Sequence, residues 1–175
     1  GKKYKTMKFG IIGTGRFGKR YAETLKKLGV EYLTTSRDPS KLSEEWKLEN
    51  NYTPDLEGLI AFSDIVIVAT PPDSHYRLAA QALERSRHVI LEKPATNDPL
   101  ECSKLRDLAN FHKKTCQVNY SYLWHPDYRR ICNTLKYNRQ PLFFHSIGIS
   151  TGPDRDFPVL ADWVSHDLAL IYNII

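Results

Sequence analysis

Short apolar segments alternate with longer amphipathic ones along the first 120 residues of the chain. The short segments are brief apolar or β-branched runs, which is the pattern of buried strands. They cover residues 8–12, 30–35, 64–69, 88–91 and 115–119. The amphipathic segments have the apolar spacing of helices. They cover residues 17–28, 39–48, 74–85 and 100–112.

This alternation predicts an α/β fold with an open, doubly wound parallel sheet. In such a sheet, ligands bind at the carboxyl ends of the strands. The pattern changes after Tyr120. There we expect a helix over 128–135, a half-exposed strand over 142–150, a polar loop over 151–158 and a helix over 160–175. Residues 121–175 are therefore expected to begin a second, α+β domain.

The length and composition permit one good core and the start of a second, with 175 residues of which 41% are apolar and 26% charged. A net charge of +5 does not indicate nucleic acid as a partner, because three lysines fall in residues 1–6 and the other cations are interspersed with acidic residues. Residues 1–6 are interpreted as a lead-in or tag remnant. No apolar run is long enough to span a bilayer, and no secretory signal is evident. We therefore expect a cytoplasmic protein without a membrane partner.

The cysteines do not indicate a disulfide framework, a metal site or a nucleophile. They are odd in number, lack C-x-x-C spacing and are interpreted as reduced, mostly buried thiols: Cys102, Cys116 and Cys132. No metal-ligand spacing is shared by the remaining histidines of unassigned role: His88, His112, His125 and His145.

A glycine-rich hexamer follows the first predicted strand and opens the first predicted helix. It reads G-x-G-x-x-G and consists of Gly13, Thr14, Gly15, Arg16, Phe17 and Gly18. In this context Gly13 permits a tight turn, Gly15 lets a pyrophosphate approach the backbone, and Gly18 allows the helix to pack on the strand. The helix N-terminus offers N–H groups to the anion. The motif predicts a dinucleotide-binding Rossmann domain over 7–120; the alternative is a glycine turn with only a structural role.

The end of the second predicted strand favours NADP over NAD. An acidic residue there would bind the ribose 2′-hydroxyl, whereas arginine accommodates a 2′-phosphate. This chain has Ser36 and Arg37 at that place, and Asp38 follows late. Arg37 can pair with a phosphate, and Ser36 adds a small donor. The alternative is that Arg37 is an exposed loop cation and that Asp38 still reaches the ribose of NAD.

Three further segments carry a family resemblance. They are ATPPDSHYRLAAQAL from Ala69, HVILEKPAT from His88 and VNYSYLWHP from Val118. With these motifs, the chain from Met7 onward resembles the Gfo/Idh/MocA family of oxidoreductases. The resemblance implies that His75 packs near the cofactor loop and that Pro94 forms a cis bond. It further implies a set of cofactor-binding residues: Thr70, Pro71, His75, Glu92, Lys93 and Asn119.

The resemblance also implies three catalytic residues. In the family, the lysine of the E-K-P motif lies beside the nicotinamide, and this role falls to Lys93. The family's aspartate and histidine, four residues apart on a helix, match Asp162 and His166. His166 would be the general base, and Asp162 would orient it or bind a neighbouring hydroxyl. The alternatives are that Lys93 is an ordinary surface lysine and that His166 has only a structural role.

The match around the second pair is imperfect. Val164 stands where the family often has glycine, and Ala169 where some members have aspartate. The segment is similar to a branch with W-D-x-G-P-H-D, which is associated with nucleotide sugars and surface-polysaccharide biosynthesis. The valine puts close packing against a substrate in doubt.

The combined interpretation is an NAD(P)-dependent dehydrogenase or reductase acting on CH–OH groups. It would transfer hydride to or from a sugar or nucleotide-sugar carbon. The alternative is a non-catalytic dinucleotide-binding sensor or assembly module. A small-molecule substrate and a homo-oligomer are expected. Because family members continue into a large antiparallel sheet, we expect this chain to be a fragment or a short product that pairs with another chain. The substrate and the direction of reaction do not follow from the sequence.

Overall fold

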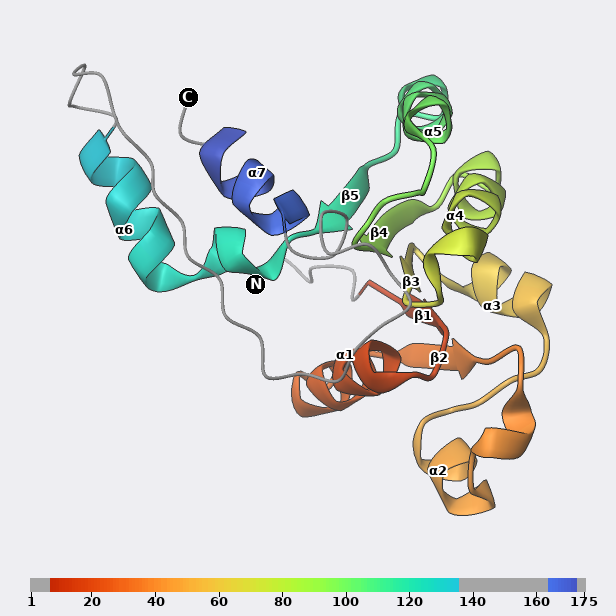
Figure 1. Cartoon of the computed structure of the whole chain (residues 1–175). Coiled ribbons are helices and arrows are strands. Elements are labelled where there is room, and N and C mark those ends of the chain that lie inside the picture. The colour runs from red at the N-terminus through yellow and green to blue at the C-terminus, as the bar shows by residue number, and fades with distance from the viewer. Residues whose placement is uncertain (1–6, 136–163, 173–175) are drawn as a thin grey trace, which may run out of the picture. The chain divides into compact units, whose positions relative to one another are not determined.

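The computed structural model describes residues 7–135 and 164–172 of the chain (Figure 1). It divides the chain into two units, Gly1–Asn119 and Tyr120–Ile175. The first unit contains a sheet with helices, and the second contains helices in its described part. The expected strand over 142–150 and the expected loop over 151–158 lie outside the described residues.

The sheet of the first unit has five parallel strands in the order β2-β1-β3-β4-β5. The strands are β1 Phe9–Ile12, β2 Tyr32–Thr35, β3 Ile65–Val68, β4 His88–Glu92 and β5 Cys116–Asn119. β1 pairs with β2 on one side and with β3 on the other, so the chain reverses its winding direction after β2. This is the doubly wound arrangement, and the predicted fold class is confirmed.

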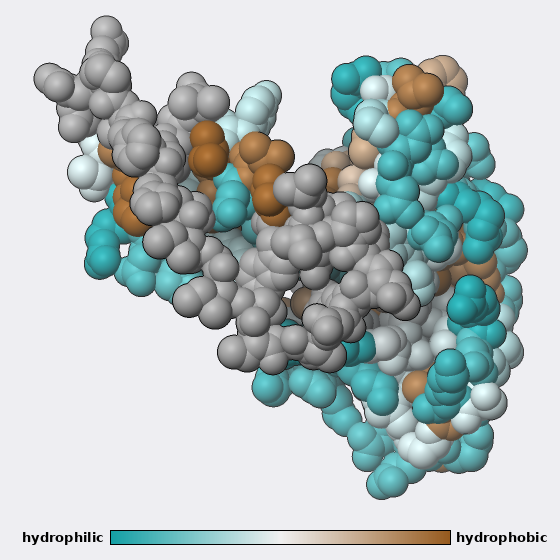
Figure 2. All heavy atoms as spheres, in the orientation of Figure 1, coloured by the Kyte–Doolittle hydropathy of each residue, from teal (hydrophilic) through white to brown (hydrophobic). Residues whose placement is uncertain are grey.

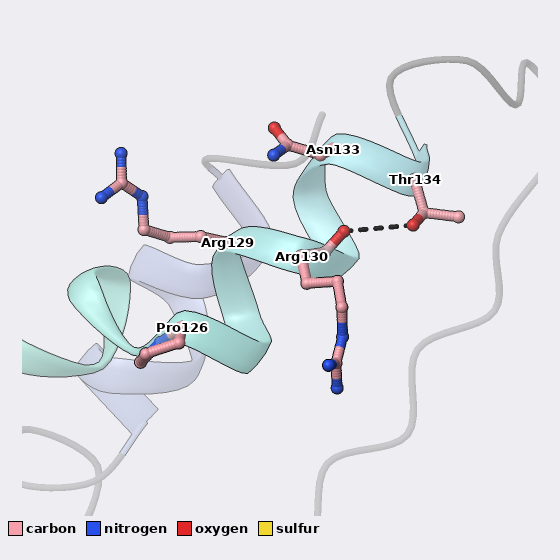
Figure 3. A pocket seen from close by; sticks show the side chains of 5 residues that line it. All are labelled: Pro126, Arg129, Arg130, Asn133 and Thr134. Carbon is pink, nitrogen blue, oxygen red and sulfur yellow. Dashed lines mark hydrogen bonds between the residues drawn. The ribbon is translucent and has the colours of Figure 1, made fainter.

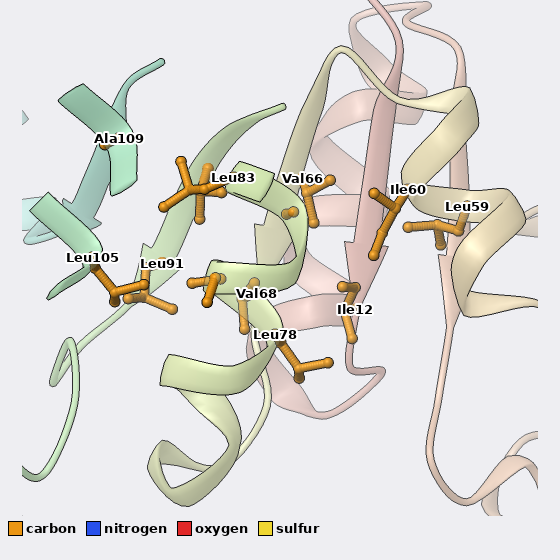
Figure 4. Close-up of a cluster of buried hydrophobic side chains, with 14 residues drawn as sticks. Ile12, Leu59, Ile60, Val66, Val68, Leu78, Leu83, Leu91, Leu105 and Ala109 are labelled. Carbon is orange, nitrogen blue, oxygen red and sulfur yellow. The ribbon is translucent and has the colours of Figure 1, made fainter. Parts of the chain in front are cut away.

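Helices cover both faces of this sheet. They include α1 Arg16–Lys27, α3 Leu56–Phe62, α4 His75–Glu84 and α5 Pro99–Phe111. One buried cluster joins α1 to Ile11 and Ile67, and the other joins α3, α4 and α5 to Ile12, Val66 and Val68 (Figure 4). Because successive strand residues point to opposite faces, these strands are apolar on both sides and read as continuous apolar runs in the sequence.

Two helices differ from the sequence expectation. The expected single helix over 39–48 is wrong: a short 3₁₀ turn, Pro39–Lys41, is followed by a separate helix α2, Glu44–Glu49. Ser43 separates the 3₁₀ turn from α2, because its side chain accepts a hydrogen bond from the backbone N–H of Trp46 and caps α2. The helix α3 was not expected. Asp55 caps it by accepting a hydrogen bond from Gly58 N at 2.9 Å.

The described part of the second unit is helical. It comprises a 3₁₀ turn Ser121–Trp124, a helix α6 Pro126–Leu135 and a helix α7 Ser165–Tyr172. The Tyr128 hydroxyl donates a 2.7 Å hydrogen bond to the carbonyl oxygen of Leu170, which ties α6 to α7. The helix expected over 128–135 is therefore confirmed with an earlier start. Of the helix expected over 160–175, α7 confirms the described middle part.

The surface is mixed in character. In Figure 2, apolar residues of the first unit are scattered among hydrophilic ones. Among residues 7–135 and 164–172, every helix is too short or too polar to cross a membrane. The expectation of mostly buried cysteines is wrong, because Cys102 is exposed and Cys116 and Cys132 are only partly covered. All three are free thiols. Burial raises the pKa of Cys116 to about 11, so this thiol stays protonated and unreactive near neutral pH.

We expect the substitution Asp55→Ala to lower the free energy of unfolding by about 1 kcal/mol, because the first turn of α3 loses its cap. Urea unfolding followed by circular dichroism measures this change. Glu23→Ala, which removes an exposed carboxylate within α1, is the matched control and should change stability by less than about 0.5 kcal/mol. Equal stability of the Asp55 variant and the wild type would contradict the capping role.

Candidate functional site

The candidate site lies at the carboxyl edge of the sheet. The strand registers place Ile12 beside Thr35 and Val68, and Leu91 beside Val68. The segments that follow these positions therefore begin next to one another. They carry most of the residues selected from the sequence, namely the glycine hexamer, Ser36, Arg37, Thr70, Pro71, Glu92 and Lys93. The structure brings these parts of the expected site together at one edge.

Two glycines of the hexamer are required by the fold itself. Gly13 has a φ of +103°, and a Cβ there would lie 2.6 Å from the carbonyl oxygen of Ala69. Its N–H donates to the carbonyl oxygen of Thr35 at 2.9 Å, so the turn leaves β1 while bonded to β2. A Cβ on Gly18 would overlap the carbonyl group of Gly13. A larger residue at Gly13 would collide with the segment after β3, and one at Gly18 would push α1 away from the glycine loop.

Gly15 is different, because no described residue requires a glycine there. Its φ of −70° suits any residue, and a Cβ would meet no atom of residues 7–135 and 164–172 within 4 Å. Gly15 precedes α1, whose N-terminus has no side-chain cap and no acidic residue in its first turn. The exposed backbone therefore leaves room for an anion next to unused N–H groups. Thr14 is partly covered, and Arg16 and Phe17 are exposed beside it. This geometry fits a dinucleotide pyrophosphate.

The residues after β2 form a self-contained turn. The carboxylate of Asp38 accepts a hydrogen bond from Ser40 N at 3.3 Å and lies 3.4 Å from Lys41 Nζ. Hydrogen bonding to Ser40, followed by Lys41, lowers the pKa of Asp38. Ser36 Oγ accepts a 3.3 Å bond from the backbone N–H of Asp38. Arg37 is exposed and forms no ion pair within residues 7–135 and 164–172.

Lys93 is half-buried, and the peptide bond that joins it to Pro94 is cis. The carbonyl oxygen of Pro94 lies 2.9 Å from Nδ1 of His75, and that of Thr70 lies 2.8 Å from Nε2. Because a carbonyl oxygen only accepts, a neutral imidazole donates to one of them and an imidazolium to both. His75 is fully buried, and its two ring contacts join the loops after β3 and β4. The expectation that it packs near the cofactor loop is consistent with this position.

Glu92, the last residue of β4, is buried in a closed hydrogen-bonded group with Tyr21 and Asn119. Its Oε1 accepts from the Tyr21 hydroxyl at 2.7 Å and from Asn119 Nδ2 at 2.8 Å. Asn119 Nδ2 also donates to the Tyr21 oxygen at 2.6 Å. Burial and the neighbouring Glu92 raise the pKa of Tyr21 far above its ordinary value, so this hydroxyl remains a donor. Sequence reasoning missed Tyr21, because its spacing in α1 matched an apolar helix face.

The residues expected to complete catalysis fall in the second unit. Asp162 lies outside the described residues. His166 lies in α7, and its ring stands edge-on to Tyr120 and Tyr122, with centroid distances of 5.8 and 5.1 Å. These contacts hold the imidazole between two aromatic rings of the segment that follows β5.

A shallow pocket also runs along α6 (Figure 3). Its lining comes from this one helix and consists of Pro126, Arg129, Arg130, Asn133 and Thr134. Arg130 pairs with Asp127 at 2.8 Å, and Arg129 lies 6.0 Å from the ring of Trp124. In Figure 3 the two arginine side chains point away from each other, so they do not converge on one ligand. Within the described part of the chain, no group of His, Cys, Asp and Glu is placed to hold a metal ion.

Comparison with known proteins agrees with this geometry. Residues 7–120 match the model of the Gfo/Idh/MocA oxidoreductases, an oxidoreductase family with an NAD-binding Rossmann fold. The chain belongs to this family. The resemblance of the E-K-P and glycine motifs to the family is thereby confirmed, and the first unit is a nicotinamide-dinucleotide-binding domain.

Two relatives have named activities. The chain is 25% identical to UDP-N-acetylglucosamine 3-dehydrogenase of Acidithiobacillus ferrooxidans, over 94% of this chain and 53% of the relative. It is 27% identical to inositol 2-dehydrogenase/D-chiro-inositol 3-dehydrogenase of Halalkalibacterium halodurans, over 66% of this chain and 36% of the relative. A crystal structure of an NAD-binding protein from Listeria innocua is 24% identical with a TM-score of 0.80, covering 98% of this chain and 55% of that one. The chain thus spans about half the length of these proteins or less.

The glycine loop yields a matched pair of substitutions. Gly15→Ala should fold as the wild type does and weaken dinucleotide binding by about 10-fold, because the added methyl group occupies the space for the anion. Gly18→Ala should instead lower the free energy of unfolding by about 3 kcal/mol, because its Cβ overlaps Gly13. Thermal unfolding and titration with NADPH, followed by nicotinamide fluorescence, separate the two effects. Unchanged affinity in folded Gly15→Ala would show that the anion does not approach this backbone.

Proposed function

We propose that the protein containing this chain is an NAD(P)-dependent oxidoreductase that acts on a CH–OH group of a sugar or nucleotide sugar. The observation that carries the proposal is the position of Lys93 at the carboxyl edge of the sheet that also presents the glycine loop. The two relatives with named activities support the substrate class, because one is named for a nucleotide sugar and the other for inositol, a ring with several hydroxyl groups. A role in surface-polysaccharide biosynthesis fits a nucleotide-sugar substrate.

Three residues would have separate roles in the reaction. The nicotinamide supplies the hydride acceptor or donor when it is bound. The ammonium group of Lys93 donates a hydrogen bond to the substrate hydroxyl and stabilises the negative charge that develops on its oxygen. His166 takes the hydroxyl proton as general base, and the edge-on rings of Tyr120 and Tyr122 hold it in one orientation. Asp162, four residues earlier, orients His166 or binds a neighbouring hydroxyl.

The turn after β2 supports NADP as the preferred cofactor. Asp38 is engaged by Ser40 and Lys41, so its carboxylate is held within its own turn. Arg37 is exposed and forms no ion pair in the described part of the chain, which leaves its guanidinium available for a 2′-phosphate. Ser36 is too small to obstruct that phosphate. NAD remains the alternative cofactor, bound through Asp38 after rearrangement of the turn.

We expect the chain to bind NADPH more tightly than NADH. Arg37→Ala should weaken NADPH binding by about 10- to 100-fold, the usual range for a hydrogen bond to a charged group, and leave NADH binding unchanged. Titrations by nicotinamide fluorescence measure all four affinities. Arg106→Ala removes an exposed arginine from α5 and is the control. Equal affinities for the two cofactors, or a preference for NADH that Arg37→Ala does not alter, would contradict the assignment.

Lys93→Ala should reduce kcat by about 10²- to 10³-fold while the dinucleotide affinity changes less than about twofold, because the ammonium acts on the reacting oxygen. The substrate is first found by screening free and nucleotide-linked sugars with NADP and NAD. Lys27→Ala removes an exposed lysine from the far end of α1 and should leave kcat unchanged. Unchanged turnover in Lys93→Ala would remove this lysine from the mechanism. Dinucleotide binding without turnover of any sugar would favour the non-catalytic sensor or assembly module.

A further inference from the structure

Two groups of partly buried hydrogen bonds flank Lys93, one on each side along the chain. On the amino side, the carboxylate of Glu92 is bound by Tyr21 and Asn119. On the carboxyl side, the carbonyl oxygen of Pro94 is bound by His75. Lys93 is therefore the residue between two anchored neighbours.

Each anchor leads to another part of the site. Tyr21 lies on α1, three residues after Gly18, on the helix that the glycine loop opens. His75 also binds the carbonyl oxygen of Thr70, in the loop after β3. Asn119 is the last residue of β5, which pairs with Glu92 in the sheet. The two groups thus connect the segment around Lys93 to the segments after β1 and β3 and to the end of β5.

Tyr21, Glu92 and Asn119 are hydrogen-bonded to one another, and each ring nitrogen of His75 faces a carbonyl oxygen of the protein. The amide oxygen of Asn119 only accepts hydrogen bonds, so it is the NH₂ group that faces the Glu92 carboxylate. This NH₂ group donates to both Glu92 and Tyr21. Glu92 is 6% exposed and His75 0%. These side chains are therefore better explained as a frame, meaning side chains that bind other parts of the protein and position its loops, than as direct contacts of a cofactor. The family resemblance suggested cofactor contacts for both.

We propose that Tyr21, His75 and Asn119 are positioning residues for Lys93, which they act on through Glu92 and Pro94. This inference rests on the proposed function, in which Lys93 stabilises the charge on the reacting oxygen. The hydrogen bonds set the position of the Lys93 backbone relative to the glycine loop and hence relative to the bound dinucleotide. A displacement of about 1 Å at such a group can reduce the rate by about 10²-fold.

Hydrogen exchange tests the anchoring in the chain itself, without any substrate. In Tyr21→Phe, which keeps the ring and removes the hydroxyl, the four amide hydrogens in residues 92–96 (all but that of Pro94, which has none) should exchange at least about 10-fold faster than in the wild type. His75→Phe, which removes both ring nitrogens, should do the same. The matched control is Tyr32→Phe, which also removes a phenol hydrogen bond, from Tyr32 to Asn50 at 3.2 Å; this bond is fully buried and lies at the first residue of β2. It should leave exchange in 92–96 unchanged, and unchanged exchange in folded Tyr21→Phe would overturn the proposal.

Kinetics of the active protein then test the consequence for Lys93. Tyr21→Phe should lower kcat by about 10- to 100-fold and leave the dinucleotide affinity and KM within about twofold. If Tyr21 acts only through Lys93, the double variant Tyr21→Phe/Lys93→Ala should be no slower than Lys93→Ala alone. An additive loss in the double variant would overturn the proposed route through Lys93.

The two proposals fail in distinguishable ways. Normal turnover in Lys93→Ala would overturn the proposed function, and with it the catalytic part of this inference. A slow Lys93→Ala variant combined with a Tyr21→Phe variant of normal kcat would overturn this inference alone. Loss of kcat in Tyr32→Phe equal to that in Tyr21→Phe would assign the effect to general loosening of the sheet and would also overturn the inference.

Discussion

The parallel direction of all five strands is the constraint on which the rest of the structure depends. Parallel neighbours need a crossover, and the crossovers of this chain place helices on both faces of the sheet. Side chains such as Ile11 and Ile12 are therefore buried on opposite faces, and no face of a central strand is left for polar chemistry. Polar groups gather instead where the strands end and the backbone leaves the sheet. The glycine loop, Arg37, Thr70 and Lys93 all lie at that edge.

A buried edge of this kind creates a second requirement, because polar side chains that leave water must find partners. Glu92 has two donors, Tyr21 and Asn119, and His75 has two carbonyl partners. Three of these bonds join segments that are far apart in the sequence: Tyr21–Glu92, Asn119–Glu92 and His75–Pro94 span 71, 27 and 19 residues. The same hydrogen bonds therefore pair the buried polar groups and fix the relative positions of the loops. The cost of losing one partner is greater than the strength of a single bond suggests, because the remaining group stays buried.

Local patterns were sufficient to predict the strands and the glycine loop, and they failed where short-range hydrogen bonds or contacts between distant elements decide the structure. The strands were predictable because burial on both faces makes them apolar throughout. The break between 3₁₀ turn and α2 depends on Ser43, whose capping bond interrupts an otherwise helical spacing. The helix α3 is only seven residues long and gives too few turns for a clear period. The role of the Tyr21 hydroxyl could not be predicted from local spacing, because its partners Glu92 and Asn119 are 71 and 98 residues away in the sequence.

The three glycines of the loop and the E-K-P motif show how a family motif separates into frame and ligand contacts. Gly13 and Gly18 cannot carry a Cβ without a clash inside the protein, whereas Gly15 could carry one in open space. Within the described residues nothing requires a glycine at position 15, and this supports the proposal that an anion binds at the N-terminus of α1. The same reasoning applies to Glu92 and Lys93. Glu92 is bound by protein donors and belongs to the frame, so a proposal for direct action on a substrate rests on Lys93, the residue that this frame holds in place.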